Sequence, residues 1–192
     1  AGATRIMTMD LHADQIQGFF EVPVDHLFSS ALFIQDIDRK ELSDLCIASP
    51  DMGGAKRAHA YGRKLEAEVV ICYKQRKKAN VIDKMTVIGE VEGKNVILVD
   101  DMVDTGGTLC KAAEMLKEKG AKTVRAYCTH GVLSGPAQER IAQSALEELV
   151  ITDTIPQISK NPKIRVISVA EMFAQVMKNV HHHESISGHF IM

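Results

Sequence analysis

The stretch from Asn95 to Lys117 reads NVILVDDMVDTGGTLCKAAEMLK, and the rest of the chain can be arranged around it. Its first part, residues 96–99, is a short apolar run that is typical of a buried parallel strand. Two carboxylates, Asp100 and Asp101, follow directly, and apolar side chains with helical spacing begin at Leu109. The stretch therefore predicts a strand, an acidic pair, a loop and a helix, in this order.

The loop of this stretch consists of Asp104, Thr105, Gly106, Gly107 and Thr108. A helix that starts here leaves backbone N–H groups unpaired, and such groups form a ready site for an anion. The glycines let the backbone approach a phosphate closely, and the threonine hydroxyls add donors. The acids before the loop suit the hydroxyls of a sugar, or Mg²⁺ held through water. The pattern indicates a phosphorylated sugar, and a plain strand-to-helix turn with acidic capping residues is the alternative.

Composition and charge limit the possible partners. The chain has 192 residues, enough for one sizeable α/β domain or for a domain plus part of another. Its net charge of −2 gives no electrostatic footprint for a nucleic acid or a membrane. No apolar run approaches transmembrane length. We therefore expect neither a nucleic-acid nor a membrane partner.

The chain has four cysteines, at positions 46, 72, 110 and 128, and most of them lie within apolar runs. They lack the spacing of metal ligands, so they are expected to be buried free thiols in a reducing compartment. A cytoplasmic location follows as an expectation.

Expected strands and helices alternate along the chain. Strands are expected at residues 5–9, 45–48, 68–73, 85–90, 96–99, 123–129, 149–151 and 164–167, and helices at 35–44, 55–65, 109–119, 136–144 and 169–180, with 24–32 irregular. This alternation predicts an α/β fold with a mostly parallel twisted sheet and helices on both faces. Ligands of such a sheet bind beyond the carboxyl ends of its strands, where residues 51–54 and 104–108 are expected.

Asp51, Met52, Gly53 and Gly54 form the second of these loops. Like the first, it joins the end of a strand to the start of a helix with a leading acid and two glycines. Two such anion sites at one edge indicate either a substrate phosphorylated at two positions or two phosphorylated substrates. A plain turn is the alternative for this loop as well.

Two further features allow a structural and a functional interpretation. His12 follows Asp10 at the end of a strand, and it is either a hydrogen-bonded structural residue or a metal ligand. A basic run at residues 74–78 lies between two expected strands. Such a run is usually a solvated loop, but a mobile basic loop near two phosphate sites could stabilise the charge of phosphoryl transfer.

Several stretches resemble the ribose-phosphate diphosphokinases, also called phosphoribosyl pyrophosphate synthetases. DLHADQIQGFF at 10–20 is similar to the family signature, SPDMGG at 49–54 to its pyrophosphate loop, KQRKKAN at 74–80 to its flexible catalytic loop, and VDDMVDTGGT at 99–108 to its ribose 5-phosphate loop. Residues 129–135 and 184–187 also resemble family stretches. The central loop is shared with type I phosphoribosyltransferases, so the resemblance implies a type I phosphoribosyltransferase-like fold.

The resemblance implies a reaction in which ATP and ribose 5-phosphate give phosphoribosyl pyrophosphate and AMP, with Mg²⁺ as cofactor. Asp100, Asp101 and residues 104–108 are implied to bind ribose 5-phosphate, and residues 51–54 to bind the pyrophosphate. His12 and Asp51 are implied to bind Mg²⁺, and Lys74 and Arg76 to be the catalytic cations. Gln75 lies between these cations and leaves their spacing unchanged. Full-length family members are hexamers, so a homo-oligomer is expected.

The chain departs from the family pattern at its beginning, because about the first third of the family's length is missing. We expect residues 1–32 to be the tail of the N-terminal domain and residues 33–192 to be the C-terminal phosphoribosyltransferase-like domain. The missing third carries much of the ATP site in the family. The chain is therefore expected to be a fragment that folds and binds phosphates but turns over little ATP.

Two other functions remain as alternatives. A phosphoribosyltransferase would need a hood for a base, and no segment indicates one. A catalytically silent regulatory subunit of the same family would be expected to lack the loop cations or acids, and these are present.

Overall fold

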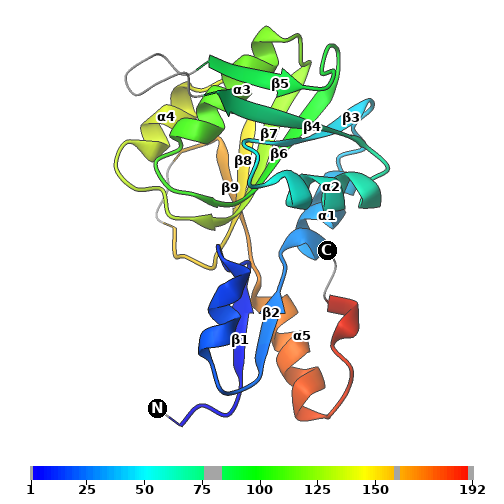
Figure 1. Cartoon of the computed structure of the whole chain (residues 1–192), viewed down its shortest axis with the longest axis vertical. Coiled ribbons are helices and arrows are strands. Elements are labelled where there is room, and N and C mark those ends of the chain that lie inside the picture. The colour runs from blue at the N-terminus through cyan, green and yellow to red at the C-terminus, as the bar shows by residue number, and fades with distance from the viewer. Residues whose placement is uncertain (1, 76–83, 158–160, 190–192) are drawn as a thin grey trace.

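Seven strands form the main sheet of the computed structural model (Figure 1), which describes residues 2–75, 84–157 and 161–189. Their order across the sheet is β5-β4-β3-β6-β7-β8-β9. The bounds are β3 Leu45–Ser49, β4 Glu68–Gln75, β5 Lys84–Ile88, β6 Asn95–Val103, β7 Thr123–Gly131, β8 Glu148–Thr152 and β9 Ile164–Ile167. All neighbouring pairs are parallel except β4 and β5, so the predicted mostly parallel sheet is confirmed.

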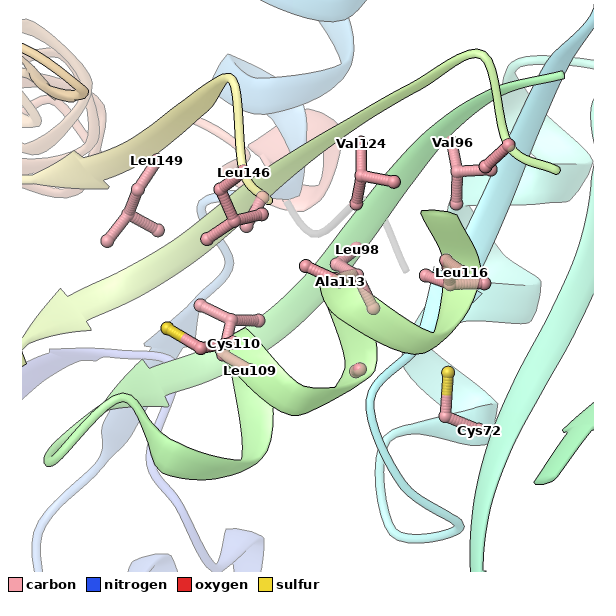
Figure 2. Close-up of a cluster of buried hydrophobic side chains, with 14 of the residues drawn as sticks. Cys72, Val96, Leu98, Leu109, Cys110, Ala113, Leu116, Val124, Leu146 and Leu149 are labelled. Carbon is pink, nitrogen blue, oxygen red and sulfur yellow. The ribbon is translucent and has the colours of Figure 1, made fainter. Parts of the chain in front are cut away.

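Helices cover both faces of this sheet, as predicted. The helices are α1 Ser30–Asp38, α2 Ala55–Lys64, α3 Gly107–Glu118, α4 Ala137–Gln143 and α5 Ala170–His181. Successive residues of β6 point to opposite faces, so Val96 and Leu98 pack with α3 and α4, whereas Ile97 and Val99 pack with α1 and α2. Figure 2 shows the first of these clusters, in which α3 lays Leu109 and Leu116 against the sheet. Because β6 is buried on both faces, its carboxyl end is held firmly in place.

A smaller unit lies beside the main sheet. β1 Ile6–Met9 and β2 Val24–Leu27 form a two-stranded parallel sheet, and the short 3₁₀ helix η1, Asp14–Phe19, lies between them in sequence. Figure 1 shows α5 packed beside these two strands, near a second 3₁₀ helix, η2, Ser187–His189. Met9, Leu27, Met172 and Val176 are buried together in this contact. The beginning and the end of the chain therefore share one apolar cluster.

Two expectations near the start of the chain are wrong. Residues 24–32 are not irregular, since they contain β2 and the beginning of α1, and the helix expected at 35–44 begins at Ser30 and ends at Asp38. Phe33 and Ile37 lie one turn apart and are buried against the sheet, so apolar packing rather than the following charges fixes this helix. Glu41 and Asp44 adopt positive φ angles of 48° and 49°, which end helical structure after Asp38.

Other expectations concern bounds, thiols and domains. β6 continues to Val103, so Asp100 and Asp101 lie within the strand rather than after it. The four cysteines are free and buried, as predicted. In the part of the chain that the structure describes, no helix is both long and apolar enough to span a bilayer. The domain boundary between residues 32 and 33 stays a prediction; this position lies within α1.

Candidate active site

A cavity of about 410 Å³ opens where the carboxyl ends of β1, β3 and β6 meet. Its walls come from the loop after β1, the loop after β3, the start of α2 and the end of β6. The lining residues are Asp10, Leu11, His12, Ala13, Asp14, Gln15, Phe28, Asp51, Gly53, Gly54, Lys56, Arg57, Asp100 and Asp101. Segments far apart in the sequence thus contribute to one polar site.

The cavity brings together half of the predicted binding residues, and the other half do not line it. His12, Asp51, Gly53, Gly54, Asp100 and Asp101 lie in its wall. Met52 is exposed and is not part of the lining, nor are residues 104–108. The backbone of Lys74 belongs to β4, and Arg76 lies outside the described residues. The roles predicted for these residues stay predictions.

Asp100 and Asp101 form an unequal acidic pair at the end of β6. The Asp101 amide donates to Asp100 Oδ1 over 2.9 Å, and His12 Nδ1 donates to Asp101 Oδ2 over 2.6 Å. Burial raises the pKa of Asp100, and its interactions with Asp101 raise it further. Burial acts in the same direction on Asp101, but the bond from His12 and other favourable contacts outweigh it and lower its pKa. One carboxylate therefore stays charged, whereas its neighbour takes up a proton more readily.

His12 is the partner that makes this pair unequal. Its bond with Asp101 raises the pKa of the imidazole above its usual value. The bond joins the loop after β1 to the end of β6 across 89 positions of sequence. His12 thus closes one wall of the cavity while its ring stays largely exposed.

The loop after β3 is shaped around Asp51. The Ser49 hydroxyl donates to the Asp51 carbonyl over 2.6 Å, and the Gly54 amide donates to Asp51 Oδ1 over 3.1 Å. A Cβ atom at position 54 would lie 2.6 Å from Ser49 Oγ, so only glycine fits the present arrangement. α2 begins at Ala55, and the first N–H groups of a helix have no partner within it. The loop and the helix start together offer amides to an anion.

Asp10 and Arg57 are site residues that the sequence analysis did not select. Asp10 has a φ of 42° and is 1% exposed. Its Oδ2 accepts from the Ser29 amide over 2.9 Å and from Thr129 Oγ1 over 2.7 Å, and its Oδ1 accepts from the Arg57 guanidinium over 2.9 Å. Burial opposes ionisation of Asp10, but Arg57 and these donors outweigh it and hold its pKa below the usual value. The available signal was the position of Arg57, the third residue of the helix after the glycine loop.

Two histidines hold the loop after β1 in place. His26 Nε2 accepts from the Leu11 amide over 2.8 Å, and burial lowers the pKa of this imidazole. His130 Nε2 donates to the carbonyls of Met9 and Asp10 over 3.1 and 3.0 Å. The loop that carries His12 is therefore fixed both to β2 and to β7.

The loop at residues 104–108 lies at the same edge of the main sheet, where β6 passes into α3. Gly106 has a φ of 73°, which glycine adopts without strain, and it precedes the first residue of α3. Arg140 of α4 donates to the Thr105 carbonyl over 3.0 Å, and the Ser134 amide donates to the Asp104 carbonyl over 3.1 Å. Both donors lie outside the loop, so these bonds hold its conformation while the first amides of α3 remain without helical partners.

Within residues 2–75, 84–157 and 161–189, no group of three or more His, Cys, Asp or Glu side chains is arranged to hold a metal ion. The oxygen donors of the cavity nevertheless suit a hard cation. Mg²⁺ usually keeps several waters and binds through one or two carboxylates together with substrate phosphates. Mg²⁺ binding by His12 and Asp51 stays a prediction.

The fold and the cavity define a class of protein. A mostly parallel sheet, covered on both faces and carrying two glycine loops and an acidic pair at its carboxyl edge, is an α/β fold of the type I phosphoribosyltransferase kind. Residues 63–191 match the family described as phosphoribosyl synthetase-associated domain, and the chain belongs to this family.

Curated relatives and a solved structure agree with this family. A ribose-phosphate pyrophosphokinase of Porphyromonas gingivalis is 52% identical over 188 residues, which cover 97% of this chain and 60% of the relative. One of Campylobacter jejuni is 53% identical over 191 residues, covering 100% of this chain and 62% of the relative. The crystal structure of phosphoribosylpyrophosphate synthetase from Mycobacterium smegmatis is 38% identical with a TM-score of 0.86, and the match covers 95% of this chain and 60% of that one. The chain thus spans about 60% of the length of these relatives.

Proposed function

We propose that the chain carries the ribose 5-phosphate and diphosphate sites of a ribose-phosphate diphosphokinase. This enzyme transfers the pyrophosphoryl group of ATP to the anomeric hydroxyl of ribose 5-phosphate. A bond forms between this hydroxyl oxygen and the β-phosphorus, the bond from the β-phosphorus to the α–β bridging oxygen breaks, AMP leaves, and the hydroxyl proton is released. The observation that supports the proposal best is the convergence of His12, Asp51, Gly53, Gly54 and the pair Asp100–Asp101 around one cavity.

The 5-phosphate binds to the loop of Asp104, Thr105, Gly106, Gly107 and Thr108. The unpaired amides at the start of α3 and the threonine hydroxyls donate to its oxygens. Thr105 and Thr108 are exposed at this loop, so a phosphate reaches them without displacing protein atoms. This site supplies binding energy remote from the reacting oxygen, which positions the ribose for transfer.

Asp100 and Asp101 bind the ribose hydroxyls between the two loops. The charged Asp101 accepts a hydroxyl hydrogen bond, and Asp100, which takes up a proton more readily, can donate as well as accept. Because both lie on β6, which is buried on both faces, their spacing is rigid. The pair therefore orients the ribose with its anomeric hydroxyl toward the loop after β3.

Residues 51–54 bind the diphosphate through the amides of the loop and of the first turn of α2. Asp51 and His12 would hold Mg²⁺, which would neutralise part of the phosphate charge. Lys74 and Arg76 are the cations that act on the charge developing during transfer. Assembly as a homo-oligomer in the cytoplasm is part of the same proposal.

The proposal is tested by titrating ribose 5-phosphate into the chain in a calorimeter. Gly107→Val places a branched side chain among the amides of the 5-phosphate loop; its Cβ atom would make ordinary contact with Thr105 Oγ1 and the Arg140 guanidinium at 3.8 Å, so the fold tolerates it while its methyl groups occupy space next to the amides. Loss of hydrogen bonds to a charged group predicts an affinity lower by about 10-fold or more. Gly188→Val is the matched control, since a Cβ atom there has nothing within 4 Å. Equal affinities for the parent chain and Gly107→Val would refute the assignment of this loop.

A further inference from the structure

We propose that Arg57 binds the diphosphate directly, and that Asp10 is the positioning residue that orients its guanidinium. This inference rests on the proposed function and deepens it, because it names a residue that makes the site prefer a ligand with a diphosphate over a phosphate monoester. It depends on three observations: where Arg57 lies, which charges surround it, and how Asp10 is held.

Arg57 lies in the first turn of α2, three residues after Gly54, and lines the cavity together with Asp51. Its side chain is 25% exposed, so most of it is enclosed while part faces the open space. Within the part of the chain that the structure describes, the one hydrogen bond of its guanidinium goes to Asp10 Oδ1 over 2.9 Å. A guanidinium has five N–H donors in a planar fork that matches phosphate oxygens. The Asp10 bond therefore leaves other donors of Arg57, on a side chain that lines the cavity, without a hydrogen-bond partner in the described residues.

The charge of the cavity explains why such a cation is needed. Its lining contains five carboxyl groups, from Asp10, Asp14, Asp51, Asp100 and Asp101, and Asp100 is the one whose pKa is raised. The lysine and arginine side chains of the lining are those of Lys56, which is exposed, and Arg57, which is half-buried. A charge that is partly enclosed acts more strongly on a ligand than one that water screens. Arg57 is thus placed to offset the repulsion between these carboxylates and an entering diphosphate.

Asp10 orients the Arg57 guanidinium through a single hydrogen bond to its Oδ1. Ser29 and Thr129 occupy its Oδ2, which leaves Oδ1 for Arg57. The residue is 1% exposed and has a φ of 42°, and His130 donates to its carbonyl over 3.0 Å. A strained residue persists where its surroundings over-determine it, and such residues gather at functional sites. Asp10 therefore presents its Oδ1 in a fixed direction, and the Arg57 fork takes its orientation from it.

The test compares two ligands on the same chain. Phosphoribosyl pyrophosphate and ribose 5-phosphate are titrated by calorimetry, in the presence of Mg²⁺, into the parent chain, Arg57→Met, Arg57→Lys and Lys64→Met. Arg57→Met is expected to lower the affinity for phosphoribosyl pyrophosphate by about 10- to 100-fold and that for ribose 5-phosphate by less than about 3-fold. Arg57→Lys is expected to restore part of the loss, because it keeps the charge without the fork. Lys64→Met removes an exposed cation at the far end of α2 and is expected to change neither affinity.

A double-mutant cycle tests the role of Asp10. Asp10→Asn keeps the size of the side chain and an acceptor oxygen for Ser29 and Thr129, but it places an amide NH2 group where Oδ1 was, and this group cannot accept from Arg57. We expect it to change the affinity for phosphoribosyl pyrophosphate in the parent chain and to have no effect in the Arg57→Met background, since it acts through Arg57. Thermal midpoints are measured first. If Arg57→Met unfolds because it leaves Asp10 unpaired, the double variant, which removes both charges, takes its place in the comparison.

Each outcome decides the inference. Equal affinity of the parent chain and Arg57→Met for phosphoribosyl pyrophosphate would overturn it while leaving the proposed function intact. Equal losses for both ligands, or an effect of Asp10→Asn that persists without Arg57, would show a merely structural ion pair and overturn it as well. A parent chain that binds neither ligand would remove the proposed function, and this inference with it.

Discussion

Gly54→Ala is the change whose effect on the diphosphate loop can be worked out most directly. The added Cβ atom would lie 2.6 Å from Ser49 Oγ, closer than such atoms can approach. Ser49 must then move, and the Asp51 carbonyl loses the hydroxyl that donates to it over 2.6 Å. The same shift disturbs the bond from the Gly54 amide to Asp51 Oδ1. Binding must restore this loop conformation against the added Cβ atom, and the net worth of one hydrogen bond, about 1 kcal/mol, then lowers the affinity for phosphoribosyl pyrophosphate by about 5-fold.

The assay is a calorimetric titration of phosphoribosyl pyrophosphate with Mg²⁺ into the parent chain, Gly54→Ala, Ser49→Ala and the double variant. If the steric reason is correct, the double variant binds no more weakly than Gly54→Ala, because removing Oγ makes room for the new Cβ atom. Gly188→Ala serves as the control for added side-chain volume at an open position. Wild-type affinity in Gly54→Ala, or losses that simply add in the double variant, would refute this reasoning.

Two further predictions concern the network of Asp36, Tyr127, Glu148 and Arg165, on the face of the sheet that α1 and α2 cover. Tyr127→Phe removes the hydroxyl that donates to Asp36 over 2.7 Å, so it is expected to lower the free energy of unfolding by about 1–2 kcal/mol and the thermal midpoint by about 3–6 °C. Tyr73→Phe, at an exposed tyrosine, is the control, and an unchanged midpoint in Tyr127→Phe would contradict the prediction. Asp36 and Glu148 are partly buried, which opposes their ionisation, but bonds from Arg165 outweigh this and lower both pKa values below 3.8 and 4.5. Their contribution to stability is complete above the ordinary pKa values and is lost as the pH falls through the lowered pKa values. The urea midpoint of the parent chain should therefore fall between about pH 5 and 3, and it should fall less in Asp36→Asn. The same dependence of the urea midpoint on pH in both proteins would disprove this linkage.

The sequence predicted those parts of the fold that depend on local patterns. The apolar runs at residues 45–48 and 96–99 are the buried portions of β3 and β6, and the glycine loops that follow them lie at the carboxyl edge of the sheet. These signals lie within a few residues of one another, so periodicity and turn chemistry suffice to find them.

What the sequence did not reveal depends on contacts between distant residues. Asp10 accepts from Thr129 across 119 positions, and Arg57 reaches Asp10 across 47, so no local pattern marks either as part of the cavity. The packing of α5 against β1 and β2 joins the two ends of the chain in the same way. The position predicted for α1 was wrong because burial of Phe33 and Ile37 against the sheet fixes this helix, and the charged residues after Asp38 do not continue it.

A crystal structure of the chain with Mg²⁺ and phosphoribosyl pyrophosphate tests the division of the site into two anion loops most directly. The 5-phosphate and the diphosphate of this ligand give separate density, so each can be assigned to a loop. We expect the 5-phosphate on the amides of residues 105–108, the ribose hydroxyls on Asp100 and Asp101, and the diphosphate against residues 51–54 and the Arg57 guanidinium. A ligand with its 5-phosphate in the cavity beside Asp51, or bound away from both loops, would contradict it.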